Sequence, residues 1–189
     1  KEEEHKYVSR PKKVVFVTGA TGTMGQETMK QLLSRNNRFK TRILARPSDK
    51  NRKLLKKYMC PSLEVVWGDM ADYDTIRKCV DGADYVLHIG AMVSPAADKY
   101  PEKTLYTNIG STLNIIKAIK EQPDPDKVHF AYVGTVAMTG SRLDPVQFGR
   151  IGDPMNPSIH DYYAVSKVFS EAAVFESGLK YWVSIRQTG

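Results

Sequence analysis

A glycine-rich turn near the amino end constrains the fold of this chain more than any other feature. The run Val-Val-Phe-Val-Thr over 14–18 is typical of a buried β-strand, and the periodic stretch over 23–35 is typical of a helix. Between them lie Gly19, Gly22 and Gly25, in a Gly-x-x-Gly-x-x-Gly spacing. Glycines let the backbone turn tightly and approach a ligand closely. Because a helix N-terminus offers free N–H groups and a positive dipole end, this turn favours binding of a phosphate group.

Strand-like and helix-like segments alternate along the rest of the chain. The expected strands are 14–18, 41–45, 63–67, 84–89, 128–133 and 181–186. The expected helices are 23–35, 50–59, 72–80, 104–120 and 162–177. Such alternation predicts a parallel sheet with helices on both faces, and right-handed crossovers favour a doubly wound α/β sheet, the Rossmann fold. A long Pro- and Gly-containing loop is expected over 141–160.

Composition bears on location and partners. The apolar runs are of strand length, none near the roughly 18 residues that span a membrane. No secretion signal opens the chain, so we expect a cytoplasmic protein that binds no membrane. The net charge of +7 attracts phosphorylated ligands in general, but no recognition motif for nucleic acid is present. Cys60 and Cys79 are expected to be free thiols, and without a His cluster no metal site is expected.

The glycine-rich turn also carries a family resemblance. The run Thr18-Gly19-Ala20-Thr21-Gly22-Thr23-Met24-Gly25 resembles the cofactor loop of short-chain dehydrogenases/reductases, and the chain resembles the extended branch of that family from about residue 13 onward. That branch includes nucleotide-sugar epimerases and dehydratases. Residues 1–12 are polar and charged, so we expect a flexible charged arm there. The resemblance implies a dinucleotide-binding domain over 13–189. It also implies that the substrate-binding region is largely absent from this chain, because in the family that region lies mostly beyond the position of Gly189.

A basic residue stands where such a fold reads the ribose of its dinucleotide. This position lies about 20 residues past the glycines, and an acid there would bind the 2′-hydroxyl of NAD. The chain instead has Arg46, followed by Lys50 and Arg52. A guanidinium holds a 2′-phosphate through a charge-assisted fork, so the sequence favours NADP over NAD.

The resemblance implies further cofactor contacts after the third and fourth strands. Asp69 and Met70 match the place of the family's adenine-binding Asp, although Asp69 capping the next helix explains the same residue. Gly90 and Ala91 match a loop whose small residues let the cofactor pass. Asn108 matches an Asn that supports the active-site framework, and the alternative is an ordinary solvated helix residue.

Tyr163 and Lys167 are the strongest catalytic candidates. Four residues apart, they share one face of the expected helix. A nearby positive charge lowers the pKa of a phenol, ordinarily about 10, which lets it exchange a proton with a substrate oxygen. Tyr-x-x-x-Lys occurs by chance about once in a chain of this composition, so its weight comes from its position after the fifth strand. Tyr162 has Ser166 four residues later, so Tyr163 is the expected acid/base.

Thr135 is the expected third catalytic residue. Aligned on Thr139-Gly140, it takes the place of the family's catalytic Ser, where a hydroxyl helps to fix the substrate oxygen. Gly134 and Thr139 depart from the Ser and Tyr usual there, which bears on the substrate pocket. The resemblance also implies that Tyr163 and Lys167 contact the cofactor, Lys167 at the nicotinamide ribose.

Two functions of different classes follow. The first is an NAD(P)-dependent oxidoreductase or epimerase/dehydratase acting on a hydroxyl/carbonyl carbon of a small molecule, with a nucleotide-sugar or related substrate as the commonest implication of the resemblance. The alternative is a non-catalytic NAD(P)-binding module that senses redox state. The presence of both Tyr163 and Lys167 favours the enzyme. A homodimer is compatible with either function.

Overall fold

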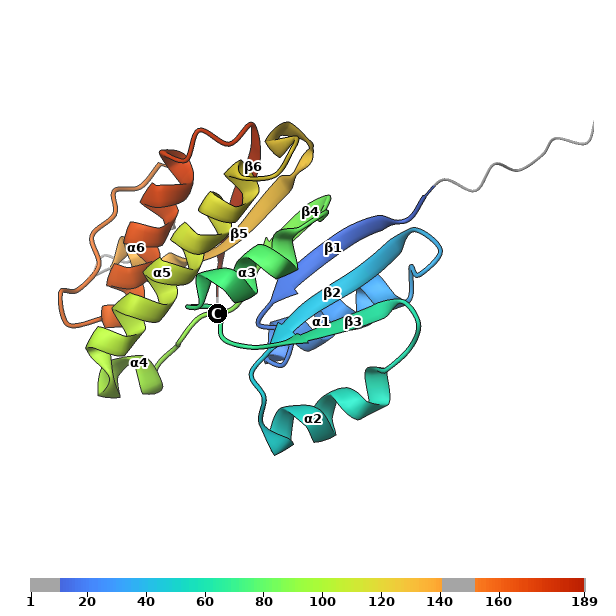
Figure 1. Ribbon diagram of the computed structural model, residues 1–189. Coiled ribbons are helices and arrows are strands. Elements are labelled where there is room, and N and C mark those ends of the chain that lie inside the picture. Colours follow the sequence, from blue (N-terminus) through green and yellow to red (C-terminus); the bar gives the residue numbers. More distant parts are fainter. Residues whose placement is uncertain (1–10, 141–151, 189) are drawn as a thin grey trace, which may run out of the picture.

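Six strands form one parallel sheet in the order β3-β2-β1-β4-β5-β6 (Figure 1). The computed structural model describes residues 11–140 and 152–188. The strands are β1 (Lys13–Thr18), β2 (Phe39–Ala45), β3 (Leu63–Trp67), β4 (Tyr85–His88), β5 (His129–Thr135) and β6 (Tyr181–Gln187). Strand order reverses between β1 and β4, and doubly wound sheets bind ligands in the crevice at such a point. The predicted Rossmann fold is confirmed.

Helices cover both faces of this sheet (Figure 1). They are α1 (Thr23–Leu33), α2 (Asp49–Leu55), α3 (Tyr73–Val80), α4 (Ala96–Lys99), α5 (Pro101–Lys120) and α6 (Tyr162–Phe175). Short 3-10 turns follow at η1 (Lys56–Tyr58), η2 (Pro125–Lys127) and η3 (Val136–Thr139). Helices α1 and α2 bury Met29 and Leu55 against β1, β2 and β3. On the opposite face, α3, α5 and α6 pack over Phe16 and Phe130.

Local capping explains where the helices depart from the expected bounds. Helix α5 begins three residues early because Pro101 occupies its first turn, where a missing N–H costs nothing. Ser48 caps α2, which tightens into η1 instead of running on to residue 59. The short α4 was not expected. The predicted arm lies outside the described residues except for its last two, and so does 141–151 of the predicted loop.

Part of the sheet carries no helix on the α1 side among the described residues. There β4, β5 and β6 present Leu87, Ala131 and Val183, and Val183 and Ile185 are 49% and 53% exposed. A hollow of about 340 Å³ lies over these strands near their amino ends. It is therefore remote from Thr135, which ends β5. No helix within residues 11–140 and 152–188 has the length and apolarity to cross a bilayer.

Candidate active site

The turn between β1 and α1 is built by close backbone contacts. Gly19 has φ +70°, and a Cβ there would lie 2.7 Å from the Cα of Gly90. A Cβ on Gly25 would lie 2.0 Å from the carbonyl oxygen of Gly19. The amide of Gly22 donates to that same oxygen at 3.0 Å and closes the turn. Glycine at 19 and 25 is thus required by geometry.

The first turn of α1 suits an anion. Its N-cap, Gly22, supplies no side-chain acceptor, and the first turn carries no acidic residue. The N–H groups of this turn therefore have no competing carboxylate within the first turn of the helix. Thr23 and Met24 lie exposed on the rim of the turn, and the carbonyl oxygen of Thr21 accepts a hydrogen bond from Gln26 at 3.2 Å.

Behind the glycine turn, a buried histidine joins three elements. Its Nδ1 lies 2.8 Å from the hydroxyl of Thr18, which in turn accepts from the amide of Gly90 at 3.0 Å. Its Nε2 lies 3.1 Å from the hydroxyl of Thr112 in α5. Burial lowers the pKa of His88 to about 3, so the ring is neutral at pH 7. His88 is a structural residue that links β1, β4 and α5.

Basic side chains gather at the carboxyl ends of β2 and β3. Arg46 is exposed immediately after β2, and its carbonyl oxygen accepts from the amide of Ser48 and the side chain of Asn51, each at 2.9 Å. These bonds shape the turn into α2. Arg52 lies 4.5 Å over the ring of Trp67 at the end of β3. The arrangement leaves Arg46 available to an anion beside the glycine turn.

Asp69 does not cap the helix that follows it. The cap of α3 is Asp72, whose carboxylate accepts from the amide of Thr75 at 3.0 Å. Asp69 accepts from the amide of Ala71 at 2.9 Å, and its side chain is exposed at the end of β3. The capping alternative for Asp69 is therefore wrong. Met70 turns back to the crevice, where its sulfur would lie 3.1 Å from a Cβ on Gly90.

Asn108 ties the loop after β4 to α6. Its Oδ1 accepts from the amide of Met92 at 2.7 Å, and its Nδ2 donates to the carbonyl oxygen of Met92 at 3.0 Å. The same Nδ2 donates to the hydroxyl of Ser166 at 2.9 Å. Asn108 is 3% exposed, so the alternative of a solvated helix residue is wrong. Ala91, next to Met92, is half-buried in the loop that these bonds hold.

The three predicted catalytic residues come together at the start of α6. Asp161 caps this helix by accepting from the amide of Ala164 at 2.9 Å, which places Tyr163 in the first turn and Lys167 one turn later. The ammonium of Lys167 lies 5.9 Å from the centre of the Tyr163 ring. Thr135 ends β5, is 7% exposed and forms a hydrogen bond with Tyr163. The site thus pairs a phenol with a hydroxyl and a cation.

The pKa of Tyr163 corrects one expectation. It is raised above its usual value, because burial disfavours the phenolate more than the hydrogen bond with Thr135 favours it. Lys167 was expected to lower it. The ammonium instead donates to the carbonyl oxygen of Val133 at 2.7 Å and lies 4.9 Å over the ring of Tyr132. Burial lowers the pKa of Lys167 to about 8, so the ammonium begins to lose its proton only slightly above neutral pH.

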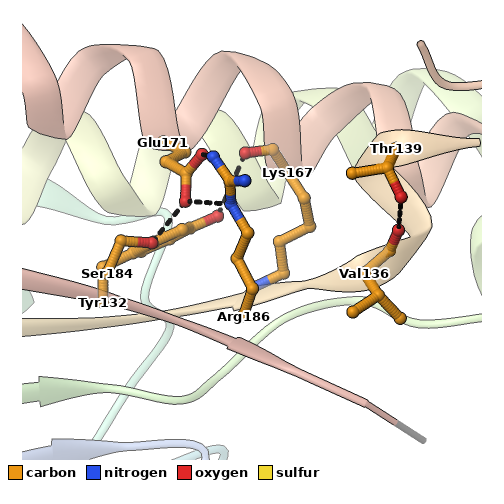
Figure 2. Close-up of polar contacts among 7 residues, drawn as sticks. All are labelled: Tyr132, Val136, Thr139, Lys167, Glu171, Ser184 and Arg186. Carbon is orange, nitrogen blue, oxygen red and sulfur yellow. Dashed lines mark hydrogen bonds and ion pairs between the residues drawn. The ribbon is translucent and has the colours of Figure 1, made fainter. Parts of the chain in front are cut away.

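A second polar group beneath α6 was missed by sequence reasoning (Figure 2). Glu171 is 2% exposed and accepts two hydrogen bonds from Arg186, from Nε at 3.1 Å and from Nη2 at 2.7 Å. The hydroxyl of Ser184 also donates to this carboxylate. The available signal was spacing: Glu171 follows Lys167 by four residues, on the same helix face.

Neither cysteine takes part in this site. Cys60 and Cys79 are both free, as predicted, and burial raises the pKa of Cys79 to about 12. Within the described ranges, no group of three or more His, Cys, Asp or Glu side chains is placed to hold a metal ion.

Comparison with known proteins adds sequence relatives. A 3 beta-hydroxysteroid dehydrogenase/Delta 5-->4-isomerase of Mycobacterium tuberculosis is 27% identical over 168 residues, which are 85% of this chain and 41% of that protein. A UDP-glucose 4-epimerase of Rickettsia massiliae is 28% identical over 110 residues, 56% of this chain and 32% of that protein. The chain thus spans less than half the length of these curated relatives.

A solved structure shares the fold of this chain, and a family model matches its sequence. The enzyme WbmH of Bordetella bronchiseptica, solved in complex with NAD+, is 28% identical with a TM-score of 0.77, over 93% of this chain and 56% of that chain. The model of the NAD dependent epimerase/dehydratase family matches residues 15–186, nearly the whole described region. The chain therefore belongs to the NAD dependent epimerase/dehydratase family.

Proposed function

We propose that this chain is the cofactor-binding and catalytic core of an NAD(P)-dependent oxidoreductase or epimerase/dehydratase that acts on a hydroxyl/carbonyl carbon. One observation carries the proposal: Thr135, Tyr163 and Lys167 converge at the same edge of the sheet as the glycine turn. The turn supplies a place for a dinucleotide and the three side chains supply a proton donor beside it. A chain that only sensed redox state would have no use for the second group.

The residues of the crevice fit a dinucleotide. The N–H groups after Gly22 suit its pyrophosphate, because the first turn of α1 has no side-chain cap and no acidic residue to compete for them. Asp69 at the end of β3 suits the adenine, and Gly90 with Ala91 leaves room along the crevice. Such a cofactor, when bound, supplies the hydride acceptor or donor. WbmH was solved with NAD+, and for this chain we propose a preference for NADP that rests on the exposed Arg46.

Tyr163 serves as the acid/base. Its raised pKa keeps the phenol protonated at neutral pH, so its Oη is ready to donate a proton to a substrate carbonyl oxygen. Thr135 holds that Oη by a hydrogen bond and orients the substrate oxygen beside it. The ammonium of Lys167 lies 5.9 Å from the centre of the ring on which the donation leaves a negative charge. In the reverse direction the phenolate takes the hydroxyl proton back.

The substrate is proposed to be a nucleotide-sugar or a related small molecule, as the name of the UDP-glucose 4-epimerase relative suggests. A second candidate is an apolar alcohol or ketone of the hydroxysteroid kind. Two observations favour it: the steroid dehydrogenase matches a longer stretch of this chain, and Val136, next to Thr135, is 41% exposed. A turnover assay on both substrate classes separates the two.

The mechanism is tested by Tyr163→Phe in the full-length protein, assayed by product formation and, where the reaction is a net oxidation or reduction, by absorbance of the reduced nicotinamide. This change keeps the ring and removes only the ionisable hydroxyl. We expect turnover to fall by about 10²–10⁴, the usual share of one positioned acid/base. Cofactor affinity measured by calorimetry should barely change, because the pyrophosphate is held at the glycine turn.

Tyr162→Phe is the matched control and should leave turnover within about threefold, too small a loss for a positioned acid/base. Should Tyr162→Phe lose activity while Tyr163→Phe keeps it, the assignment of the acid/base is wrong. Should neither change matter while NADPH or NADH still binds, the redox-sensing module becomes the better account.

A further inference from the structure

Glu171 and Arg186 form an ion pair beneath α6 that has no part in the reaction proposed above (Figure 2). The carboxylate comes from the third turn of α6 and the guanidinium from the carboxyl end of β6. Their two hydrogen bonds make a bidentate fork, a geometry that fixes orientation as well as distance. Ser184 donates to the same carboxylate and anchors it to a second position of β6. We call Glu171, Arg186 and Ser184 the clamp.

Within the clamp, the side chain of Arg186 passes Gly134 of β5 before it meets Glu171 of α6. In the sheet Gly134 is the register partner of Arg186, and a Cβ at Gly134 would lie 3.4 Å from the Cγ of Arg186 and 3.0 Å from the Cε of Met138. The stem of Arg186 therefore lies beside the backbone of β5 at the residue before Thr135. A Cβ at Gly134 would crowd Met138, whereas it would lie in ordinary van der Waals contact with the stem of Arg186.

The clamp holds the turn of α6 that follows Lys167. The backbone carbonyl of Lys167 accepts from the hydroxyl of Tyr132 at 3.3 Å, and its ammonium donates to the carbonyl of Val133 at 2.7 Å. Both contacts fix Lys167 to β5. Glu171, one helical turn away, fixes the same helix face to β6. The helix that carries Tyr163 and Lys167 is thus held to two strands on one side.

Energetics favour a geometric role for this pair. The carboxylate of Glu171 is buried and the side chain of Arg186 is 29% exposed. Such an ion pair contributes little net stability, because desolvation and solvent screening offset the attraction. Its directional fork is what apolar residues cannot supply. We propose that the clamp positions Tyr163 and Lys167 over the end of β5, which makes Glu171 and Arg186 positioning residues for the site. This inference rests on the proposed function.

The test compares two clamp variants with the parent in the full chain. The double variant Glu171→Leu with Arg186→Met keeps the apolar volume and removes the fork. Arg186→Lys keeps the charge and loses the bidentate geometry. The matched control is Glu64→Leu with Arg42→Met, which removes an ion pair of 3.1 Å between β2 and β3. Three quantities are measured: the Tm, the affinity for NADH, and the titration of Lys167 by NMR of ¹³Cε-labelled lysine, assigned with Lys167→Met.

We expect the double variant to keep a Tm within about 5 °C of the parent, since the ion pair adds little net stability. The titration midpoint of Lys167 should rise by about one pH unit or more, because a loosened α6 admits water to the ammonium. Affinity for NADH should fall by about threefold or more, since the resemblance places Lys167 at the nicotinamide ribose. Arg186→Lys should change the Lys167 titration midpoint and the NADH affinity in the same directions as the double variant does, but by smaller amounts. The control pair should leave the Lys167 titration unchanged.

Each contrary outcome has one meaning. A Lys167 titration and an NADH affinity equal to those of the parent overturn the clamp, whether or not the Tm falls. If the double variant does not fold, Arg186→Lys decides by the same two readouts. If the parent itself binds neither NADH nor NADPH, the proposed function fails, and the clamp is then judged by the Lys167 titration alone.

Discussion

The two halves of the crevice are built by different means. The turn between β1 and α1 is made of backbone, with Gly19 and Gly25 leaving no space for a Cβ. The site at β5 and α6 is made of side chains, with Thr135, Tyr163 and Lys167 brought together from two elements. The first occupies seven consecutive residues, whereas the second depends on α5 and β6 as well. A backbone site is fixed by local geometry, and a side-chain site is fixed by the packing around it.

The two halves also differ in their electrostatics. The glycine turn offers N–H dipoles and has no ionised group in the first turn of α1. The β5–α6 site buries Lys167 and Glu171 within one helix, and burial sets the pKa of Lys167 and raises that of Tyr163. We therefore expect the glycine turn to be sensitive to added side-chain atoms, and the β5–α6 site to be sensitive to changes of charge or pH.

The sharpest expected effect is that of one methyl group at the glycine turn. Gly25→Ala places a Cβ 2.0 Å from the carbonyl oxygen of Gly19, so α1 must move off the turn. We expect affinity for NADPH to fall by about 100-fold or more, roughly 2.7 kcal/mol, by calorimetry. Gly110→Ala in α5 is the matched control: nothing lies within 4 Å of its Cβ, and it should raise the free energy of unfolding by about 0.5–1 kcal/mol. If Gly25→Ala and Gly110→Ala bound NADPH with equal affinity, the backbone account would be wrong.

At the β5–α6 site the corresponding test is pH. The folded-state pKa of Lys167, about 8, lies below its ordinary value of 10.5, so between these values the unfolded chain binds the proton that the folded chain has released. The free energy of unfolding therefore rises with pH across this window. Relative to Lys167→Met, we expect the parent to gain about 2 kcal/mol from about pH 7 to about pH 10 in urea titrations.

The control for that pH series is Lys103→Met, since Lys103 is exposed on α5, which covers the same face of the sheet as α6. Its pH dependence should match that of the parent. A Lys167→Met variant with the same pH dependence as the parent would show that the ammonium is hydrated, and the contrast between the two halves would lose its electrostatic part.

The smallest expected effect concerns the exposed edge of the backbone half. If Arg46 holds a 2′-phosphate, NADPH should bind at least about tenfold tighter than NADH, a difference of about 1.4 kcal/mol. Arg46→Asp should erase or invert this preference in calorimetric titrations. Arg38→Asp, with the same charge change just before β2 at the amino edge of the sheet, should leave it unchanged. Equal affinities in the parent would remove the basis for the NADP proposal.

Sequence reasoning served the backbone half better than the side-chain half. The β-branched run before Gly19 and the periodic stretch after it predicted both the fold and the turn, because each signal is local. The shared helix face of Tyr163 and Lys167 was predicted for the same reason. The direction of the Tyr163 pKa was not, since spacing reports a neighbouring charge but not the burial that outweighs it.

The contacts that escaped prediction join elements far apart in sequence. Asn108 was expected in the framework, but its partner Ser166 lies 58 residues later. Glu171 and Arg186 are separated by 15 residues and a change from helix to strand. By contrast, the start of α3 at Asp72 was predicted, because an Asp just before a periodic stretch is a local signal.

The approach of Gly19 to Gly90 has a consequence for how this sequence can vary. The Cα of Gly90 and the Cβ position of Gly19 lie 2.7 Å apart, so the two loops pack with no space for a side chain between them. Once a side chain at either position has pushed the loops apart, a second at the other meets less resistance, and the two costs do not add. Substitutions at positions 19 and 90, which are 71 residues apart in the sequence, are therefore coupled: the cost of a side chain at one position depends on which residue stands at the other.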